Sequence, residues 1–406
     1  MMSKALEGLK VLDFSWAIAG PLISKHLADF GATVVKVESS RRIDNVRISA
    51  PAFEGVTGAN RSGYFAFFNG NKLSLEVDLN SAEGTEIARK LVVWADVIVE
   101  SFRPGNLEKW GLGSDELLKL NPSAIIMRCT MQGQTGPYSK QPGMGIQLAA
   151  LSGFTHLTGW PDRQPVPPFG AYTDAVAPPF GISALIAALL YRRRTGKGQC
   201  LDLSQYEASL HFLSPVLIDY NANGVNQERM GNADPEMAPH GVFPCREEDT
   251  WCAISVTNEI QWQAFCNVLG KPEWLSDSRF VNAVARKHNE AELNELILGL
   301  TLAFTCQELM SGLQANNVPA GMVQTTRDLT ADPQLKARHA FWKMEHREMG
   351  SFLHMGSPLL LSKTPACGER PAPCIGEHTQ YVLQDILGLS EEEIGELLAK
   401  GVCNIG

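Results

Sequence analysis

The 406-residue sequence lacks the features that mark several protein classes. Its nine cysteines are odd in number, scattered and without a CxxC pair, which predicts neither a disulfide framework nor a zinc site. After the first apolar run the chain reads SWAIAGP instead of a glycine fingerprint, which disfavours a nicotinamide dehydrogenase. The sequence does not open on a charged leader with an apolar core, and it contains no internal repeat. Together these absences predict a reduced, cytoplasmic enzyme without a metal.

Positive charge is also in short supply. Lys and Arg total 35 against 44 Asp and Glu, which gives a formal net charge of -9. This balance argues against nucleic acid or an anionic membrane as a partner, although one local basic pocket can still hold a small anion. The most apolar stretch, residues 180–191, has about half of the roughly 20 residues that a spanning helix needs. It predicts a buried helix.

Alternating strand and helix patterns fill the first 130 residues. Apolar runs predict strands at 9–14, 33–38, 96–100 and 123–129, and a further strand at 200–203. Helical patterns lie between them, including those at 83–94 and 115–120. Strands and helices at this spacing predict an α/β fold with a parallel sheet covered on both faces. Ligands of such sheets bind outside the carboxyl ends of the strands.

A polar stretch near 222–239 predicts a linker to a second unit. That unit is expected to hold a strand near 251–256, helices near 260–269 and 291–301, and a turn at 319–321. Farther along, Ser390 is followed by three glutamates, which is typical of a helix start with an N-cap and acidic first turn.

Asp174 is the most interesting carboxylate because it lies among small and apolar residues, in GAYTDAVAPPFG, ahead of an apolar helix. One interpretation is a helix N-cap, which spacing alone favours. The other is a nucleophile, because a carboxylate in a partly dry pocket near a helix N-terminus stays ionised and becomes more reactive.

Several motifs, in order, carry a resemblance over nearly the whole chain. They include LEGLKVLDFSWAIAGP, LADFGATVVKVE, ADVIVESFRPGNLEKWGL, NPSAIIMRCTMQGQTGPY and the segment around Asp174. The chain resembles the class III CoA-transferases, a family that also includes arylsuccinate CoA-transferases and 2-methylacyl-CoA racemases. The resemblance implies a large Rossmann-like parallel-sheet domain (1–225 and a C-terminal return at 331–406) with a smaller α/β domain inserted at 226–330. It also implies an interlocked dimer with an identical or homologous chain.

The resemblance further implies a mechanism. Asp174 occupies the position of the family's nucleophilic aspartate, which attacks an acyl-CoA thioester and becomes an aspartyl-CoA thioester. An acceptor carboxylate then takes the CoA. Coenzyme A thioesters are thus the substrates, and no cofactor is expected to stay bound.

For the CoA itself, the resemblance implies contacts from several loops. Arg103 and Lys109 are expected to form a local positive patch, and Arg41 and Arg42 to replace a basic residue that formyl-CoA transferases carry after the second strand. The full set of expected CoA-binding residues is Ala17, Ile18, Ala19, Arg41, Arg42, Lys72, Ser101, Phe102, Arg103 and Lys109.

Departures from the family pattern bear on the substrate. The glycine loop of formyl-specific enzymes is absent, and Gly145 stands where an acidic residue is common, so formyl transfer is disfavoured. Residues 143–148 read GMGIQL and lack the His and Asp of the racemases. The run around Asp174 is most similar to benzylsuccinate CoA-transferases, which use succinyl-CoA as donor. Phe154, Trp160, Phe169 and Tyr172 are candidates for an apolar acyl pocket.

Two alternatives stay open. One is a 2-methylacyl-CoA racemase-like enzyme. The other is a CoA-binding, non-catalytic subunit of a heteromeric CoA-transferase, against which the presence of Asp174 counts.

Overall fold

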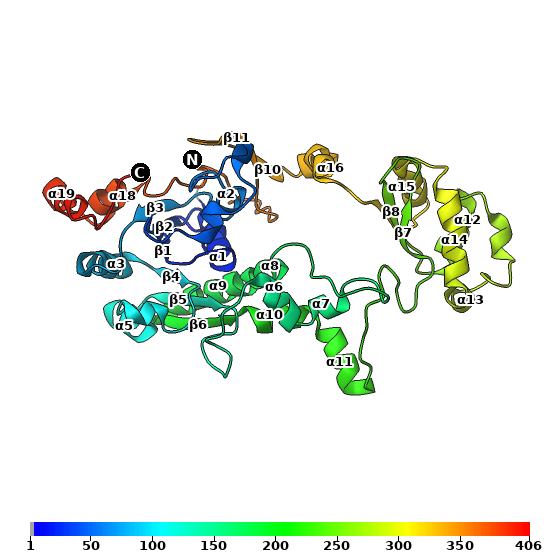
Figure 1. Cartoon of the computed structure of the whole chain (residues 1–406), viewed down its shortest axis with the longest axis horizontal. Coiled ribbons are helices and arrows are strands. Elements are labelled where there is room, and N and C mark those ends of the chain that lie inside the picture. Colours follow the sequence, from blue (N-terminus) through cyan, green and yellow to red (C-terminus); the bar gives the residue numbers. More distant parts are fainter. Residues whose placement is uncertain (1–3) are drawn as a thin grey trace. The chain divides into compact units, whose positions relative to one another are not determined.

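The computed structural model describes residues 4–406, which form two compact units (Figure 1). The first unit contains residues 4–155, 167–226 and 336–406, and the second contains residues 156–166 and 227–335. The segment 156–166, which the sequence analysis placed in the large domain, therefore belongs with the smaller unit.

The first unit is built on a six-stranded sheet in which every pair of neighbours is parallel (Figure 1). The strand order is β3-β2-β1-β4-β5-β6, which is the doubly wound order of nucleotide-binding folds. The expected parallel sheet is confirmed, with one strand, β3, that the pattern did not reveal. The strands are β1 (Lys10–Asp13), β2 (Thr33–Glu38), β3 (Leu73–Glu76), β4 (Val97–Glu100), β5 (Ile125–Thr130) and β6 (Gln199–Ser204).

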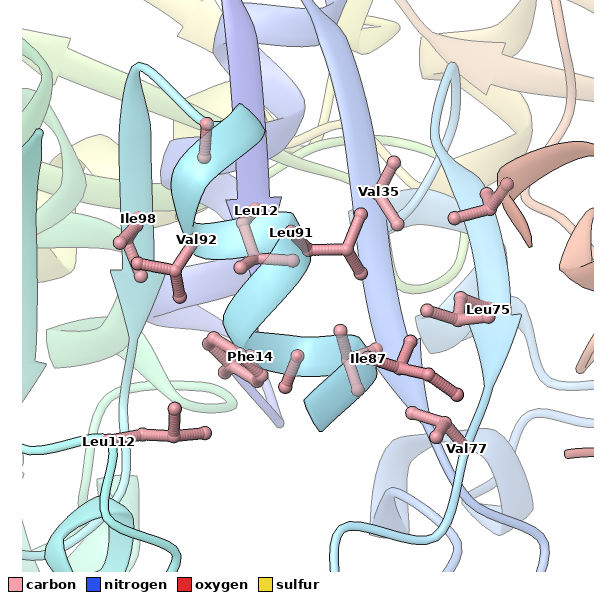
Figure 2. Packing of buried hydrophobic residues seen from close by; sticks show 14 of the residues in the cluster. Leu12, Phe14, Val35, Leu75, Val77, Ile87, Leu91, Val92, Ile98 and Leu112 are labelled. Atoms are coloured by element: carbon pink, nitrogen blue, oxygen red, sulfur yellow. The ribbon is translucent and has the colours of Figure 1, made fainter. Parts of the chain in front are cut away.

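Helices cover both faces of this sheet because successive side chains of a strand point to opposite faces. On one face, Leu91 and Val92 of α3 lie against Leu12, Val35 and Ile98 of the strands (Figure 2). On the other face, α1 and α9 bury a second set of strand residues. The covering helices are α1 (Ala19–Asp29), α3 (Ala82–Trp94), α5 (Ser114–Leu120) and α9 (Pro178–Thr195).

The apolar helix is longer than the sequence analysis expected. Within residues 4–406, Tyr172–Thr195 is the one unbent helical segment long and apolar enough to cross a membrane, and a third of its apolar 18-residue stretch is buried. The bent pair α14 and α15 passes the same test of length and composition. In the first unit, Leu185 and Ala188 of α9 pack into the core on one face of the sheet.

Residues 336–406 return to the first unit. They form an antiparallel hairpin, β10 (Phe341–His346) and β11 (Gly350–Met355), and then run beside β3. Gly376 N donates to Ser74 Oγ at 2.9 Å, and Val77 forms an isolated bridge with Cys403. The predicted helix start at Ser390 is confirmed, since its hydroxyl accepts from Glu393 N and the Glu393 carboxylate accepts from Ser390 N.

The second unit has its own core. A three-stranded antiparallel sheet packs with helices around Trp262, Phe265 and Leu309. The expected turn at 319–321 is largely strand β9. The strands are β7 (His240–Pro244), β8 (Trp251–Ser255) and β9 (Ala320–Met322), and the helices include α12 (Glu259–Val268), α13 (Ala283–His288), α14 (Glu290–Thr301) and α15 (Cys306–Ala315).

All nine cysteines are free thiols.

The remaining helices complete the chain. The shorter helices are η1 (Asn45–Ile48), η2 (Phe53–Gly55), α2 (Gly63–Phe68), α4 (Asn106–Lys109), α6 (Gly145–Leu151), α7 (Phe154–Leu157), α8 (Tyr172–Val176), α10 (Gln205–Phe212), α11 (Ser214–Asn223), η3 (Pro272–Leu275), α16 (Thr326–Ala331), α17 (Pro333–Ala337), α18 (Thr379–Tyr381), η4 (Val382–Ile386) and α19 (Glu391–Ala399).

Candidate active site

A cleft of about 340 Å³ opens at the carboxyl ends of β1, β4 and β5. Strands β1 and β4 are neighbours in the sheet, and the strand order reverses between them, so the cleft lies at the topological switch point where such folds bind ligands. The lining residues follow the strands or come from the helices above them. The cleft is lined by Trp16, Ala17, Ile18, Ala19, Asn45, Val46, Ser49, Tyr64, Ser101, Arg103, Thr130, Met131, Ser139, Gln141, Gly143, Met144, Gly145, Leu148, Ala171, Asp174 and Gln205.

The loop after β1 is fixed by two side chains, Ser101 just after β4 and Asp44 at the N-cap of η1. Trp16 N donates to Ser101 Oγ at 3.0 Å, and Ser101 Oγ donates back to Trp16 O at 3.1 Å. Ala17 N donates to Asp44 Oδ1 at 3.1 Å, and Ala17 has a left-handed backbone with φ of 62°. These contacts hold the backbone of the loop against the cleft.

The structure brings half of the expected CoA-binding residues to this cleft. Ala17, Ile18, Ala19, Ser101 and Arg103 line it together with Asp174. Among the lining residues in the described part of the chain, Arg103 is the only cation.

Three other expected residues do not line the cleft. Phe102 and Lys109 border a separate hollow of about 500 Å³, together with Trp110. The Arg42 guanidinium lies over the ring of Trp16, 5.5 Å from its centroid.

The sequence analysis expected Lys72 to bind CoA. In the structure Lys72 is fully buried and does not line the cleft. Its ammonium donates to Asp13 Oδ2, Pro21 O and Asn69 Oδ1, each at 2.9 Å, so all three protons are used within the protein. Burial lowers the pKa of Lys72 to about 8, and the nearby Asp13 carboxylate opposes that shift. Burial disfavours ionisation of Asp13, but Lys72, Lys36 and two serine hydroxyls hold its pKa at about 2. Lys72 therefore links Asp13, the last residue of β1, to Pro21 in α1 and to Asn69.

The sequence analysis also expected Arg41 to bind CoA, but the structure places it away from the cleft. Its Nη1 lies 2.5 Å from Asp78 Oδ2, and Nη2 donates to Gly401 O at 3.0 Å. The guanidinium thus pairs at the surface with the C-terminal return, and it lies outside the residues that line the cleft.

Asp174 lies in the first turn of α8, which packs against α6 and α10. The N-cap interpretation is wrong, since Ala171 caps α8 and Ala177 caps α9. Within residues 4–406 the carboxylate accepts no hydrogen bond and forms no ion pair. Burial without a compensating charge raises the pKa of Asp174 to about 6. The cleft thus presents an unpaired, partly dry carboxylate.

This pKa predicts the acid limb of the activity profile. With Asp174 in the nucleophilic role that the resemblance implies, only the ionised carboxylate would react, so kcat/KM is expected to rise with pH and to reach half of its plateau near pH 6. An ordinary aspartate would give a midpoint near pH 4. Initial rates from pH 4 to 8 at low substrate check this, and a midpoint near pH 4 would contradict the desolvated site.

Gly145 explains how a helix can approach that carboxylate. A Cβ atom at this position would lie 2.6 Å from Asp174 Oδ2 and 2.9 Å from the Cβ of Ala171. The missing side chain therefore makes room for the acidic group, at a position where the resembled family often has an acidic residue.

Gly145→Ala is expected to displace the carboxylate and lower kcat by about 10²-fold, because a shift near 1 Å is enough for such a loss. Steady-state kinetics measure the effect. Gly395→Ala is the matched control, since nothing lies within 4 Å of a Cβ there. Equal activity of the two variants would show that Gly145 has no part in placing Asp174.

An open parallel sheet with a carboxylate-bearing cleft at its switch point defines an α/β enzyme of the nucleotide-binding type. Residues 6–379 match the family model described as CoA-transferase family III. The chain belongs to this family, and it is a CoA-transferase.

Relatives and solved structures agree with this assignment. The chain is 33% identical over 400 residues to a succinyl-CoA–D-citramalate CoA-transferase of Chloroflexus aurantiacus, covering 98% of both chains. It is also 33% identical to the beta subunit of a succinyl-CoA–L-malate CoA-transferase of the same organism, again covering 98% of both. A crystal structure of a CAIB/BAIF family protein from Brucella suis superposes with a TM-score of 0.86 at 32% identity, covering 95% of this chain and 100% of that one.

Sequence reasoning missed Thr130 and Gln205, which also line the cleft. Both directly end or follow a strand, β5 and β6, so the rule that ligands bind at carboxyl ends was the signal that could have found them.

The aromatic residues proposed for an acyl pocket are placed elsewhere. Phe154 and Tyr172 pack edge to face at 5.2 Å, Phe169 is 98% exposed, and none of the three lines the cleft. Trp160 belongs to the second unit, where its ring packs at Gly231.

Proposed function

We propose that this enzyme moves CoA from succinyl-CoA to a dicarboxylic acid of four or five carbons, through an aspartyl-CoA thioester on Asp174. The observation that carries the proposal is the unpaired, partly desolvated Asp174 carboxylate in the switch-point cleft. Desolvation makes a carboxylate a stronger nucleophile. Five residues that line the cleft are proposed to receive the CoA, namely Ala17, Ile18, Ala19, Ser101 and Arg103.

The chemistry is balanced without any net proton transfer. An Asp174 oxygen attacks the thioester carbonyl carbon, the C–S bond breaks, and a mixed anhydride and CoA thiolate form. The thiolate then attacks the aspartyl carbonyl and expels succinate, which leaves the aspartyl-CoA thioester. The acceptor carboxylate repeats both exchanges in reverse order. The site has to exclude water, because water would hydrolyse both intermediates.

The substrate proposal is supported by the names of the two relatives, which pair succinyl-CoA with citramalate or malate. A benzylsuccinate-type acceptor receives less support, since none of Phe154, Phe169 and Tyr172 lines the cleft. Initial rates with malate, citramalate, glutarate and benzylsuccinate as acceptors separate the two classes. A clear preference for benzylsuccinate would contradict the aliphatic acceptor.

We also propose that the active form is a dimer, in the cytoplasm, with an identical or homologous chain. Helix α11 supports this because it has no buried residue and exposes Ile218 and Tyr220 by 65% and 59%. One of the named relatives is a subunit of a two-component enzyme. Sedimentation of the purified chain distinguishes a dimer from a monomer that needs a homologue.

The decisive experiment is mass spectrometry of the protein after incubation with succinyl-CoA, with and without hydroxylamine or borohydride. Without either reagent the aspartyl thioester keeps its CoA, whereas hydroxylamine or borohydride releases the CoA and leaves a hydroxamate or an alcohol on the same residue. A CoA-sized adduct on the peptide that contains Asp174 is expected, and Asp174→Asn should form none. An adduct on another residue would overturn the mechanism. An inactive chain that gains transfer only with an active homologue would instead establish the non-catalytic subunit.

A further inference from the structure

Two polar side chains of the cleft each hold a buried atom that has no hydrogen-bond partner within residues 4–406. Thr130 and Gln205 line the cleft with Asp174, and they are only 4% and 7% exposed. Thr130 Oγ1 and Gln205 Oε1 are buried and form no hydrogen bond. Buried polar atoms are nearly always paired, and an unpaired one costs about 1–3 kcal/mol. The two residues therefore require a partner that the chain itself does not supply.

The sheet places these two side chains together. Thr130 ends β5 and is in register with Ser204, which ends β6, and Gln205 comes next in the chain. Tyr206 N donates to Met131 O at 3.0 Å, which ties the two strand ends. Because neighbouring strands lie about 4.8 Å apart, both side chains can reach one small ligand group.

The pair also adjoins the nucleophile. Gln205 begins α10, which packs against α8, the helix that carries Asp174. All three residues line the same cleft, so a ligand group held by Thr130 and Gln205 lies in the cleft that also contains the Asp174 carboxylate.

The chemistry of the pair favours an oxygen that is neutral at first and gains charge during the reaction. A hydroxyl and an amide are neutral donors, and Arg103, the only cation lining the cleft among residues 4–406, follows β4 instead. Rotation of the Gln205 amide by about 180° places the donor Nε2 where Oε1 now lies. In a partly dry site, such fixed donors stabilise developing negative charge most strongly.

We propose that Thr130 Oγ1 and Gln205 Nε2 donate hydrogen bonds to the acyl carbonyl oxygen of the bound thioester. When Asp174 attacks the carbonyl carbon, the C=O electron pair moves to this oxygen. The electron pair returns to the carbonyl when the C–S bond breaks and the CoA thiolate leaves. Neither Thr130 nor Gln205 therefore gives up its proton. The inference rests on the proposed function, since it takes Asp174 as the nucleophile.

The test uses Thr130→Val and Gln205→Met, which keep shape and remove the donors. The rate of adduct formation with succinyl-CoA is followed by rapid quench and intact mass. Each variant is expected to be about 10- to 10³-fold slower, with the Kd for free CoA unchanged. The unfolding free energy should equal or exceed that of the wild type, because an unpaired buried polar group is removed. A purely structural role would lower it.

Thr195→Val and Gln380→Met are matched controls at exposed positions outside the cleft, and wild-type rates are expected for both. Adduct formation at the wild-type rate in both cleft variants would overturn this inference and leave the proposed function intact. Loss of stability together with slow adduct formation would also overturn it. Wild-type enzyme that transfers CoA without any adduct on Asp174 would overturn both.

Discussion

Asp174→Asn is expected to abolish CoA transfer, with a loss in kcat of at least about 10⁴-fold, while the folded protein becomes more stable at neutral pH. The amide has almost the same shape as the carboxylate but cannot attack a thioester. Free CoA should still bind, because the residues that fix the loop after β1 are untouched. Transfer assays and CoA titrations measure the two effects.

The gain in stability follows from the raised pKa. The folded protein holds the Asp174 proton up to about pH 6, whereas the unfolded chain releases it near the ordinary value of 3.8. Between these values stability falls as pH rises, and above pH 6 the ionised group costs up to about 3 kcal/mol. Asparagine avoids this cost, so the variant should gain stability at pH 7 and little at pH 4.

Denaturant unfolding at both pH values checks the prediction. Asp162→Asn is the control, since that carboxylate is exposed and its replacement should change stability by less than about 0.5 kcal/mol at either pH. An Asp174→Asn protein that is less stable at pH 7 would show that the carboxylate is not desolvated.

Lys72→Met is expected to lower the unfolding free energy by roughly 3–5 kcal/mol, because it leaves the Asp13 carboxylate buried without its cation. Both side chains of this ion pair are 0% exposed. If Lys72 were instead a CoA ligand, the variant would bind CoA poorly and keep its stability. Denaturant unfolding beside CoA titration therefore decides between the sequence expectation and the structure.

Arg41→Met provides the comparison, since its ion pair with Asp78 is at the surface with the arginine side chain 64% exposed. Such pairs contribute about 0–1 kcal/mol. Asp13→Leu combined with Lys72→Met should recover part of the lost stability, because no unpaired charge remains. No recovery would mean that the cost of Lys72→Met lies elsewhere.

The sheet could be read from the sequence because parallel strands are buried on both faces and appear as apolar runs. Strand β3 escaped because Ser74 and Glu76 interrupt its run, although both are buried. Ser74 Oγ donates to Glu38 at 2.8 Å, and the tail supplies further partners from about 300 positions away. Contacts at that separation leave no periodic signal.

In the candidate active site, too, some residues could be predicted from the sequence and others could not. Asp174 and the loops after β1 and β4 could be placed from motifs, because strand ends converge at one edge of a sheet. Lys72 could not, since a buried ion pair and a ligand-binding lysine look alike until Asp13 is seen beside it. Thr130 and Gln205 differ from other polar residues only in being buried without partners, which is a property of the folded chain.

The return of residues 336–406 to the first unit has a consequence during synthesis on the ribosome. The edge strand β3 obtains its covering contacts, such as Gly376 with Ser74, only after the whole second unit has been made. Until residues 336–406 have been synthesised, the nascent first unit therefore exposes the edge of β3. Such an edge aggregates or binds chaperones. In ribosome-arrested chains in which residue 335 is followed by a flexible linker long enough to span the exit tunnel, limited proteolysis should find the second unit protected and the first unit cleaved. The unit that contains the Asp174 cleft would then be the later one to mature, although most of it is translated first.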